Sequence, residues 1–136
     1  KKLARTPNIK LADYRTPSET VLKGADIIVS INGTAIAEAA FFSKPAIQVG
    51  TLGTTRLLPN VTQHTDITTL CAKIKEVLSS PLEGEEYEHQ LENFVAAAYD
   101  TGFPMKYLTD WDTPAEDRDA VWRLYQDELI RVISLK

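Results

Sequence analysis

The pattern in residues 25–50, ADIIVSINGTAIAEAAFFSKPAIQVG, specifies the class of fold. Residues 25–31 are almost wholly apolar after Asp26 and rich in β-branched side chains, which predicts a strand buried on both faces. Residues 32–34 (NGT) interrupt this run, and residues 35–43 contain strong helix formers up to a break at Lys44 and Pro45. Residues 46–49 form the next apolar run. A strand, a turn, a helix and a second strand in this order predict an α/β domain with a parallel sheet.

The flanking residues extend this alternation of strands and helices. Residues 8–13 (NIKLAD) predict a short strand, and residues 16–19 (TPSE) form a capping box for a helix that ends at Gly24. A loop is expected over residues 51–60, a strand over 61–64, and then a helix that Thr65 or Asp66 caps. Two further amphipathic helices are expected, over residues 87–99 and after a second capping box at 113–116.

Length and composition suit one compact domain. The 136 residues are 43% hydrophobic and 25% charged, which excludes collagen-like, low-complexity and wholly disordered classes. The net charge of −4 gives no basic field for nucleic acid, and no apolar run is long enough for a transmembrane segment. The single Cys71 excludes an internal disulfide and suits a cytoplasmic protein, and the scattered His and Cys residues predict no metal site.

Charge divides the chain into two parts. Residues 1–82 contain ten Lys or Arg and six Asp or Glu, whereas residues 83–136 contain five and thirteen. We therefore expect an α/β core over residues 1–82 and a helical extension over residues 83–136 that packs on the same domain. Because the first residue is Lys1, we also expect the chain to be a piece of a longer protein.

The turn at Asn32, Gly33 and Thr34 is the first candidate for chemistry. It lies where a buried strand passes into a helix, and there backbone N–H groups and a glycine can hold a phosphate. A simple tight turn with a hydroxyl cap is the alternative. Glu38 follows Thr34 by one helical turn and could accept hydrogen bonds from two ribose hydroxyls beside a diphosphate, although an exposed helix glutamate explains it equally well.

The same residues resemble a known family. Residues 25–50, with the preceding PNIKLADYRTPSETVLKGAD, are similar to the carboxyl-terminal domain of GT-B glycosyltransferases, most of all those of surface or capsular polysaccharide biosynthesis. The resemblance covers about residues 7–80 and is shared by sugar-nucleotide epimerases. It implies a Rossmann-like, three-layer half of a GT-B fold with a carboxyl-terminal helical tail.

The resemblance also implies roles for individual residues. Gly33 and Thr34, with Asn32 beside them, would meet the diphosphate of a nucleotide-sugar donor, and Glu38 would hold the ribose. Related retaining transferases carry a second glutamate seven residues earlier, where this chain has Ser30. Gly50 follows the next strand and faces the same cleft, and Arg56 could pair with a phosphate, although an exposed loop arginine is the commoner case.

By the same resemblance, the catalytic base would lie on an amino-terminal domain that these residues do not include. The expected function is donor binding for a sugar transfer without a cofactor. A UDP-sugar is the expected donor and a saccharide or lipid-linked molecule the acceptor, at the cytoplasmic face of the membrane through partners. Two alternatives stay open, a sugar-nucleotide epimerase and a non-catalytic module whose helical tail, residues 103–136, binds a partner.

Overall fold

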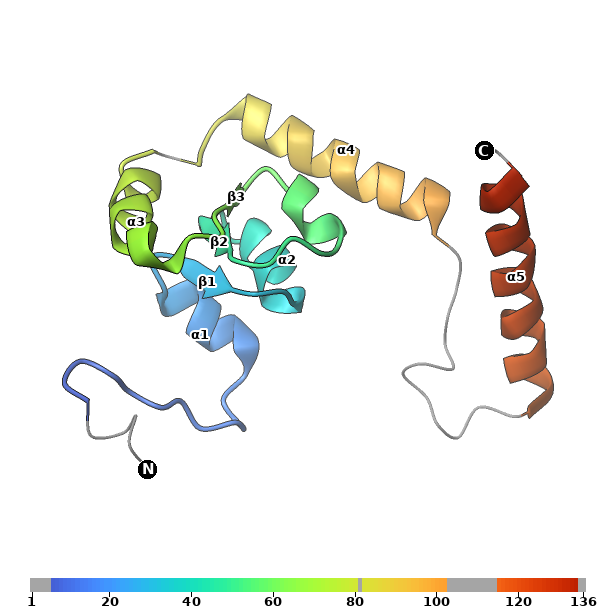
Figure 1. The fold of residues 1–136 in the computed structure, drawn as a ribbon, viewed down its shortest axis with the longest axis horizontal. Helices are drawn as coiled ribbons and strands as arrows, with labels where there is room; N and C mark the ends of the chain where they lie inside the picture. Colours follow the sequence, from blue (N-terminus) through green and yellow to red (C-terminus); the bar gives the residue numbers. More distant parts are fainter. Residues whose placement is uncertain (1–5, 81, 103–114, 135–136) are drawn as a thin grey trace. The chain divides into compact units, whose positions relative to one another are not determined.

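A computed structural model describes residues 6–80, 82–102 and 115–134 of the chain. The architecture is mixed α/β, with a small open parallel sheet and helices α1 to α5, and is consistent with a Rossmann-like domain (Figure 1). The fold class expected from the sequence is therefore confirmed. Contacts group the chain into one unit over residues 1–94 and another over residues 95–136, with the boundary inside α4.

The sheet of the first unit has three parallel strands in the order β1-β2-β3. They are β1 (Ile28–Ser30), β2 (Ala46–Gln48) and β3 (Val61–Gln63), and Ala46 of β2 lies between Ile28 and Val61. All three residues of the central strand β2 are fully buried. Because the strands are parallel, their carboxyl ends meet at one edge of the sheet. The predicted site residues lie in the connections that leave β1 and β2 from that edge.

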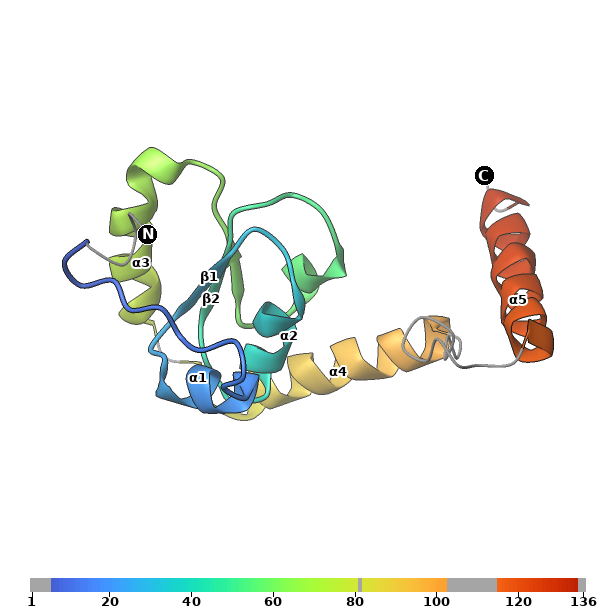
Figure 2. The same ribbon diagram turned by 90° about the horizontal axis from the view of Figure 1, so that it is seen from below.

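Short helices connect and cover these strands. They are α1 (Ser18–Gly24), α2 (Thr34–Ala40) and α3 (Leu70–Leu78), and Figure 2 shows α2 and α3 on opposite sides of the sheet. Two single turns of 3-10 helix, η2 (Thr54–Leu57) and η3 (Ile67–Thr69), lie in the loops. The apolar core between α1, α2 and the sheet contains Leu22, Ile36, Ala39, Ala40, Ala46, Ile47 and Leu58.

The last two helices agree with the amphipathic patterns of the sequence. Helix α4 (Glu85–Thr101) is fastened to α2 at its first turn, where the Tyr87 hydroxyl donates to the Ala40 carbonyl at 2.6 Å. Helix α5 (Ala115–Ser134) belongs to the second unit, and its Trp122 and Tyr125 rings stack with centroids 5.5 Å apart. Residues 113 and 114 of the second predicted capping box lie outside the described residues.

Three details of the sequence-based prediction are wrong. Residues 8–13 form no strand and are exposed throughout. Asp13 organises a turn instead. Its side chain accepts hydrogen bonds from the backbone N–H and guanidinium of Arg15, and its carbonyl accepts from the Thr16 backbone N–H at 2.9 Å. The helix begins at Ser18 with no side-chain cap, so the capping box of residues 16–19 does not form.

The first strand is also less buried than its apolar sequence predicts. Val29 is 41% exposed and Ile31 is 73% exposed. Strand β1 is an edge strand that bonds to β2 alone among the described strands, and part of its side-chain surface is left uncovered by the described residues. A continuous apolar run therefore indicates a strand here, but not its place in the sheet.

Candidate functional site

The turn after β1 has the conformation that the sequence predicts for an open, glycine-containing connection. Gly33 has φ +143° and immediately precedes α2, so any side chain there would strain the backbone. The nearest described atom to a side-chain carbon built on Gly33 is Ser30 Oγ, at 4.0 Å. The Ser30 hydroxyl donates to the Asn32 carbonyl at 2.9 Å, and this hydrogen bond holds the turn in its conformation. The space above Gly33 is thus open to a ligand.

Gln48, at the end of the central strand, ties the loops of this edge together. Its side chain is fully buried, and Nε2 donates to the carbonyls of Gly50 at 3.1 Å and Leu52 at 2.8 Å. Its Oε1 accepts from the Thr55 hydroxyl at 2.8 Å. A buried amide with all its bonds made stabilises a unique arrangement of its partners. The loop after β2 is therefore held against the sheet.

Asn32 joins the turn to that same loop. In one orientation its Oδ1 accepts from Gln48 Nε2 at 3.0 Å, and in the other its Nδ2 donates to the Leu52 carbonyl at 2.7 Å. Both orientations direct the side chain inward, and a side chain built on Gly53 would lie 3.9 Å from Asn32 Oδ1. The amide of Asn32 thus has a structural partner in either orientation, and its predicted contact with the donor stays a prediction.

Gly50 is required by close packing of two backbone segments. Its N–H donates to the Ile31 carbonyl at 3.0 Å, and a side-chain carbon at Gly50 would lie only 2.5 Å from that oxygen. The Gly50 carbonyl also accepts from Gln63 at 3.2 Å. These contacts explain the glycine without a ligand, and its predicted contact with the donor stays a prediction.

Glu38 faces α1 rather than pointing away from the domain. It is half-buried, and its Oε2 accepts from the Ser18 hydroxyl at 2.8 Å. Residues four apart on a helix share a face, and helical side chains tilt toward the amino terminus, so Glu38 lies beside the turn of α2 that Thr34 begins. The structure therefore brings the Glu38 carboxylate and the Ser18 hydroxyl together, and a ligand shared with the turn over residues 32–34 stays a prediction.

Arg56 lies in η2, next to Thr55, which is bonded to Gln48. It is exposed, and it makes no ion pair with any residue that the structure describes. Its guanidinium is therefore available to an anion at this edge of the sheet, as the sequence-based hypothesis requires, but nothing in the geometry aims it at Gly33. The role of Arg56 stays a prediction.

Three residues of this edge were not singled out from the sequence. A glutamine inside the short apolar strand 46–49 was a signal for Gln48, because a buried polar group needs specific partners. The local sequence pattern places Ser18 in a capping box and Thr55 in a loop, and predicts no further role for either residue. Their partners are 20 and 7 residues away along the chain, so local patterns could not reveal them.

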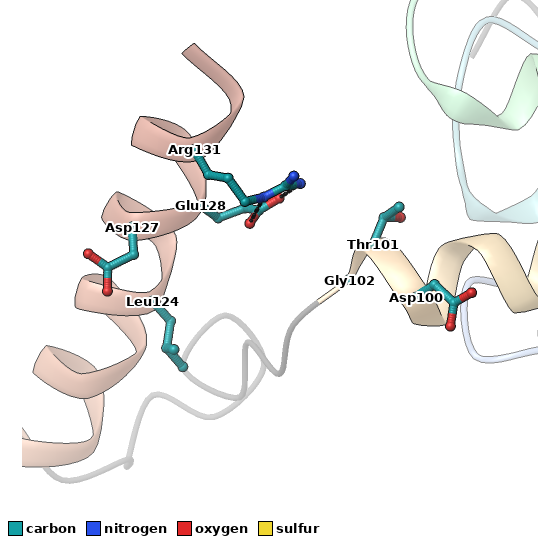
Figure 3. Close-up of a pocket in the computed structure, with 7 residues that line it drawn as sticks. All are labelled: Asp100, Thr101, Gly102, Leu124, Asp127, Glu128 and Arg131. Atoms are coloured by element: carbon teal, nitrogen blue, oxygen red, sulfur yellow. Dashed lines mark hydrogen bonds and ion pairs between the residues drawn. The ribbon is translucent and has the colours of Figure 1, made fainter. Parts of the chain in front are cut away.

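Other parts of the described chain offer no better site. A cavity of about 590 Å³ in the second unit is lined by Asp100, Thr101, Gly102, Leu124, Asp127, Glu128 and Arg131 (Figure 3). Arg131 is bonded to Glu128 at 2.6 Å, so the remaining charged lining residues are acidic and unsuited to a phosphate. The described residues contain no cluster of His, Cys, Asp or Glu that could hold a metal ion. Within them, every helix is too short or too polar to cross a bilayer.

Comparisons with models of protein families, with curated proteins and with solved structures find no match for this chain. The resemblance to GT-B glycosyltransferases therefore rests on the quoted residues alone.

Proposed function

We propose that this chain is the donor-binding domain of a glycosyltransferase and binds the nucleotide part of a nucleotide-sugar. The observation that supports this most is the position of the Glu38 carboxylate, one helical turn from Thr34 and held by Ser18 at 2.8 Å. A carboxylate accepts hydrogen bonds but does not donate them, so it suits a pair of sugar hydroxyls. The turn beside it offers backbone N–H groups to a phosphate.

The proposed binding mode divides the nucleotide between two neighbouring features. The diphosphate would lie over the open turn at Gly33, with the Thr34 hydroxyl beside it. The ribose would lie toward α1, within reach of Glu38. Helix α2 has only seven residues, so its dipole is short, and the phosphate contact would come from local N–H groups. Those groups would stabilise the leaving diphosphate as the glycosidic bond breaks.

The reaction assigned to this site is transfer of a sugar for surface polysaccharide synthesis. A UDP-sugar is the proposed donor and a saccharide or lipid-linked molecule the acceptor. The base that activates the acceptor would come from another domain. We place the reaction in the cytoplasm, in keeping with the exposed, unpaired thiol of Cys71.

Calorimetric titration of the 136-residue chain with UDP, CMP, GDP and inorganic phosphate tests the proposal. We expect one nucleotide to bind at millimolar concentration or tighter, and Glu38→Ala to weaken it by about tenfold because a hydrogen-bonded charged group is lost. Glu92→Ala, which removes an exposed glutamate of α4, is the matched control and should change nothing. Equal affinity in Glu38→Ala would remove Glu38 from the site, and absence of binding by every nucleotide would overturn donor binding.

A second candidate function has its own observation. Helix α5 exposes large apolar side chains on one stripe, with Trp122 52%, Leu129 47% and Ile133 63% exposed. A non-catalytic module that binds a partner through this helix would account for them. That function predicts a stable complex lost in Trp122→Ala and Leu129→Ala, together with no affinity for any nucleotide.

A further inference from the structure

Helix α1 contacts α2 at one point and the residues just beyond the end of α2 at a second. Ser18, in the first turn of α1, donates to Glu38 of α2, and Lys23, in the last turn, lies 5.2 Å from the centroid of the Phe42 ring. The contact nearer the start of α1 is also the one nearer the start of α2. The two helices therefore lie side by side and run in the same direction. Leu22, only 5% exposed, anchors α1 in the core between them.

This alignment fixes the hydroxyl of Ser18 at the carboxylate of Glu38. Ser18 is exposed and Glu38 half-buried, so solvent and ligand reach both. An unrestrained glutamate has three side-chain torsions and loses their freedom when it binds a ligand. A hydrogen bond from a fixed serine removes part of that cost in advance.

The bond also determines which part of the carboxylate is left for a ligand. Ser18 occupies one acceptor site of Oε2, and among the described residues no donor other than Ser18 reaches either oxygen. A carboxylate has about four such sites, so Oε1 and the remaining site of Oε2 can accept from two neighbouring hydroxyls. A pair of adjacent hydroxyls is what a ribose presents and what a 2′-deoxyribose lacks.

We propose that Ser18 is a positioning residue that orients Glu38 toward the two ribose hydroxyls and so makes the site selective for ribonucleotides. The inference rests on the proposed function, because it assumes that a nucleotide binds beside Glu38. It adds a residue from α1 to the site and a discrimination between two classes of ligand.

The test compares the affinities of UDP and 2′-deoxy-UDP for five forms of the full chain. Wild type should favour UDP by about tenfold, the effect of one hydrogen bond to a charged group. Ser18→Ala and Ser18→Val should bind UDP several-fold more weakly and reduce the preference to about twofold. Ser18→Thr, which is nearly the same shape as the valine variant but keeps the hydroxyl, should restore both. Thr20→Ala removes another exposed hydroxyl of α1 and serves as the control.

The outcomes separate this inference from the function on which it rests. A bond that only joined the helices would change stability but leave the ratio of the two affinities at its wild-type value. UDP binding with the same preference in Ser18→Val would therefore overturn the inference and leave the proposed function standing. No binding of UDP to wild type would overturn UDP as the ligand, and this inference with it. Circular dichroism of each variant verifies that the change reports on the site in a folded chain.

Discussion

Replacing Gln48 with leucine should release the loop that follows β2 from the sheet. Leucine has a similar volume, so the substitution keeps the packing of the fully buried site but removes its bonds to Gly50, Leu52 and Thr55. The contact with Asn32 at 3.0 Å is lost as well. The change therefore tests whether this one amide organises the carboxyl edge of the sheet.

The size of the effect follows from those contacts. Each intramolecular hydrogen bond contributes about 1 kcal/mol net, so losing three or four costs about 3–4 kcal/mol. Burial of the more apolar leucine recovers about 1 kcal/mol. The free energy of unfolding should therefore fall by about 2–3 kcal/mol, a large share of the 5–15 kcal/mol typical of a domain.

Urea unfolding followed by far-ultraviolet circular dichroism measures this change. The midpoint should fall while the slope with urea stays constant, because the surface exposed on unfolding is unchanged. Gln63→Leu is the control: Gln63 donates to the same Gly50 carbonyl at 3.2 Å but is exposed, so its loss should be within about 0.5 kcal/mol. If Gln48→Leu costs no more than Gln63→Leu, the loop does not depend on Gln48.

Three further changes test other contacts of the first unit. Gly50→Ala should cost about 1–3 kcal/mol in urea unfolding, because the new carbon meets the Ile31 carbonyl. Tyr87→Phe should cost about 1 kcal/mol by removing the bond to Ala40. Burial raises the pKa of Tyr87, so wild type should lose stability as the pH rises above about 10, a loss that the phenylalanine variant should lack. Asp66→Ala should lower the melting temperature at neutral pH. Hydrogen bonds from Thr68 and Thr69 lower the pKa of Asp66, so the carboxylate stabilises the fold while it is ionised. Protonation in acid removes this stabilisation, and the difference in melting temperature between wild type and variant should be smaller there. Equal melting temperatures at neutral pH would exclude Asp66 as a cap.

The sequence predicts most helices and strands of this fold well because each has a strong local signal. The buried strand over residues 46–48 follows from a short apolar run, and the helix over residues 70–78 follows from an apolar face. The predicted cap at Asp66 forms on the 3-10 turn η3 that precedes this helix. The strand expected at residues 8–13 fails because strands need a neighbour, and a local pattern does not state whether one exists.

The candidate site is also predictable from the sequence only in part. The turn at Gly33 and the place of Glu38 on its helix follow from nearest neighbours along the chain. The partner of Glu38 does not, because the register between α1 and α2 depends on how Leu22 packs in the core. Gln48 is similar, since its bonds join segments that only the assembled sheet brings together. What ligand these groups bind stays a prediction until it is measured.

The exposed edge of β1 has a practical consequence for anyone who handles this chain. Ile28 and Ser30 bond to the neighbouring strand segment, so the backbone groups of Val29 point outward, beside a side chain that is 41% exposed. Such an edge offers a second molecule the backbone groups of one residue only, and a strand as short as these three residues is a poor template for edge-to-edge pairing. A lysine in place of Val29 would protect that edge further by putting a charge beside those backbone groups.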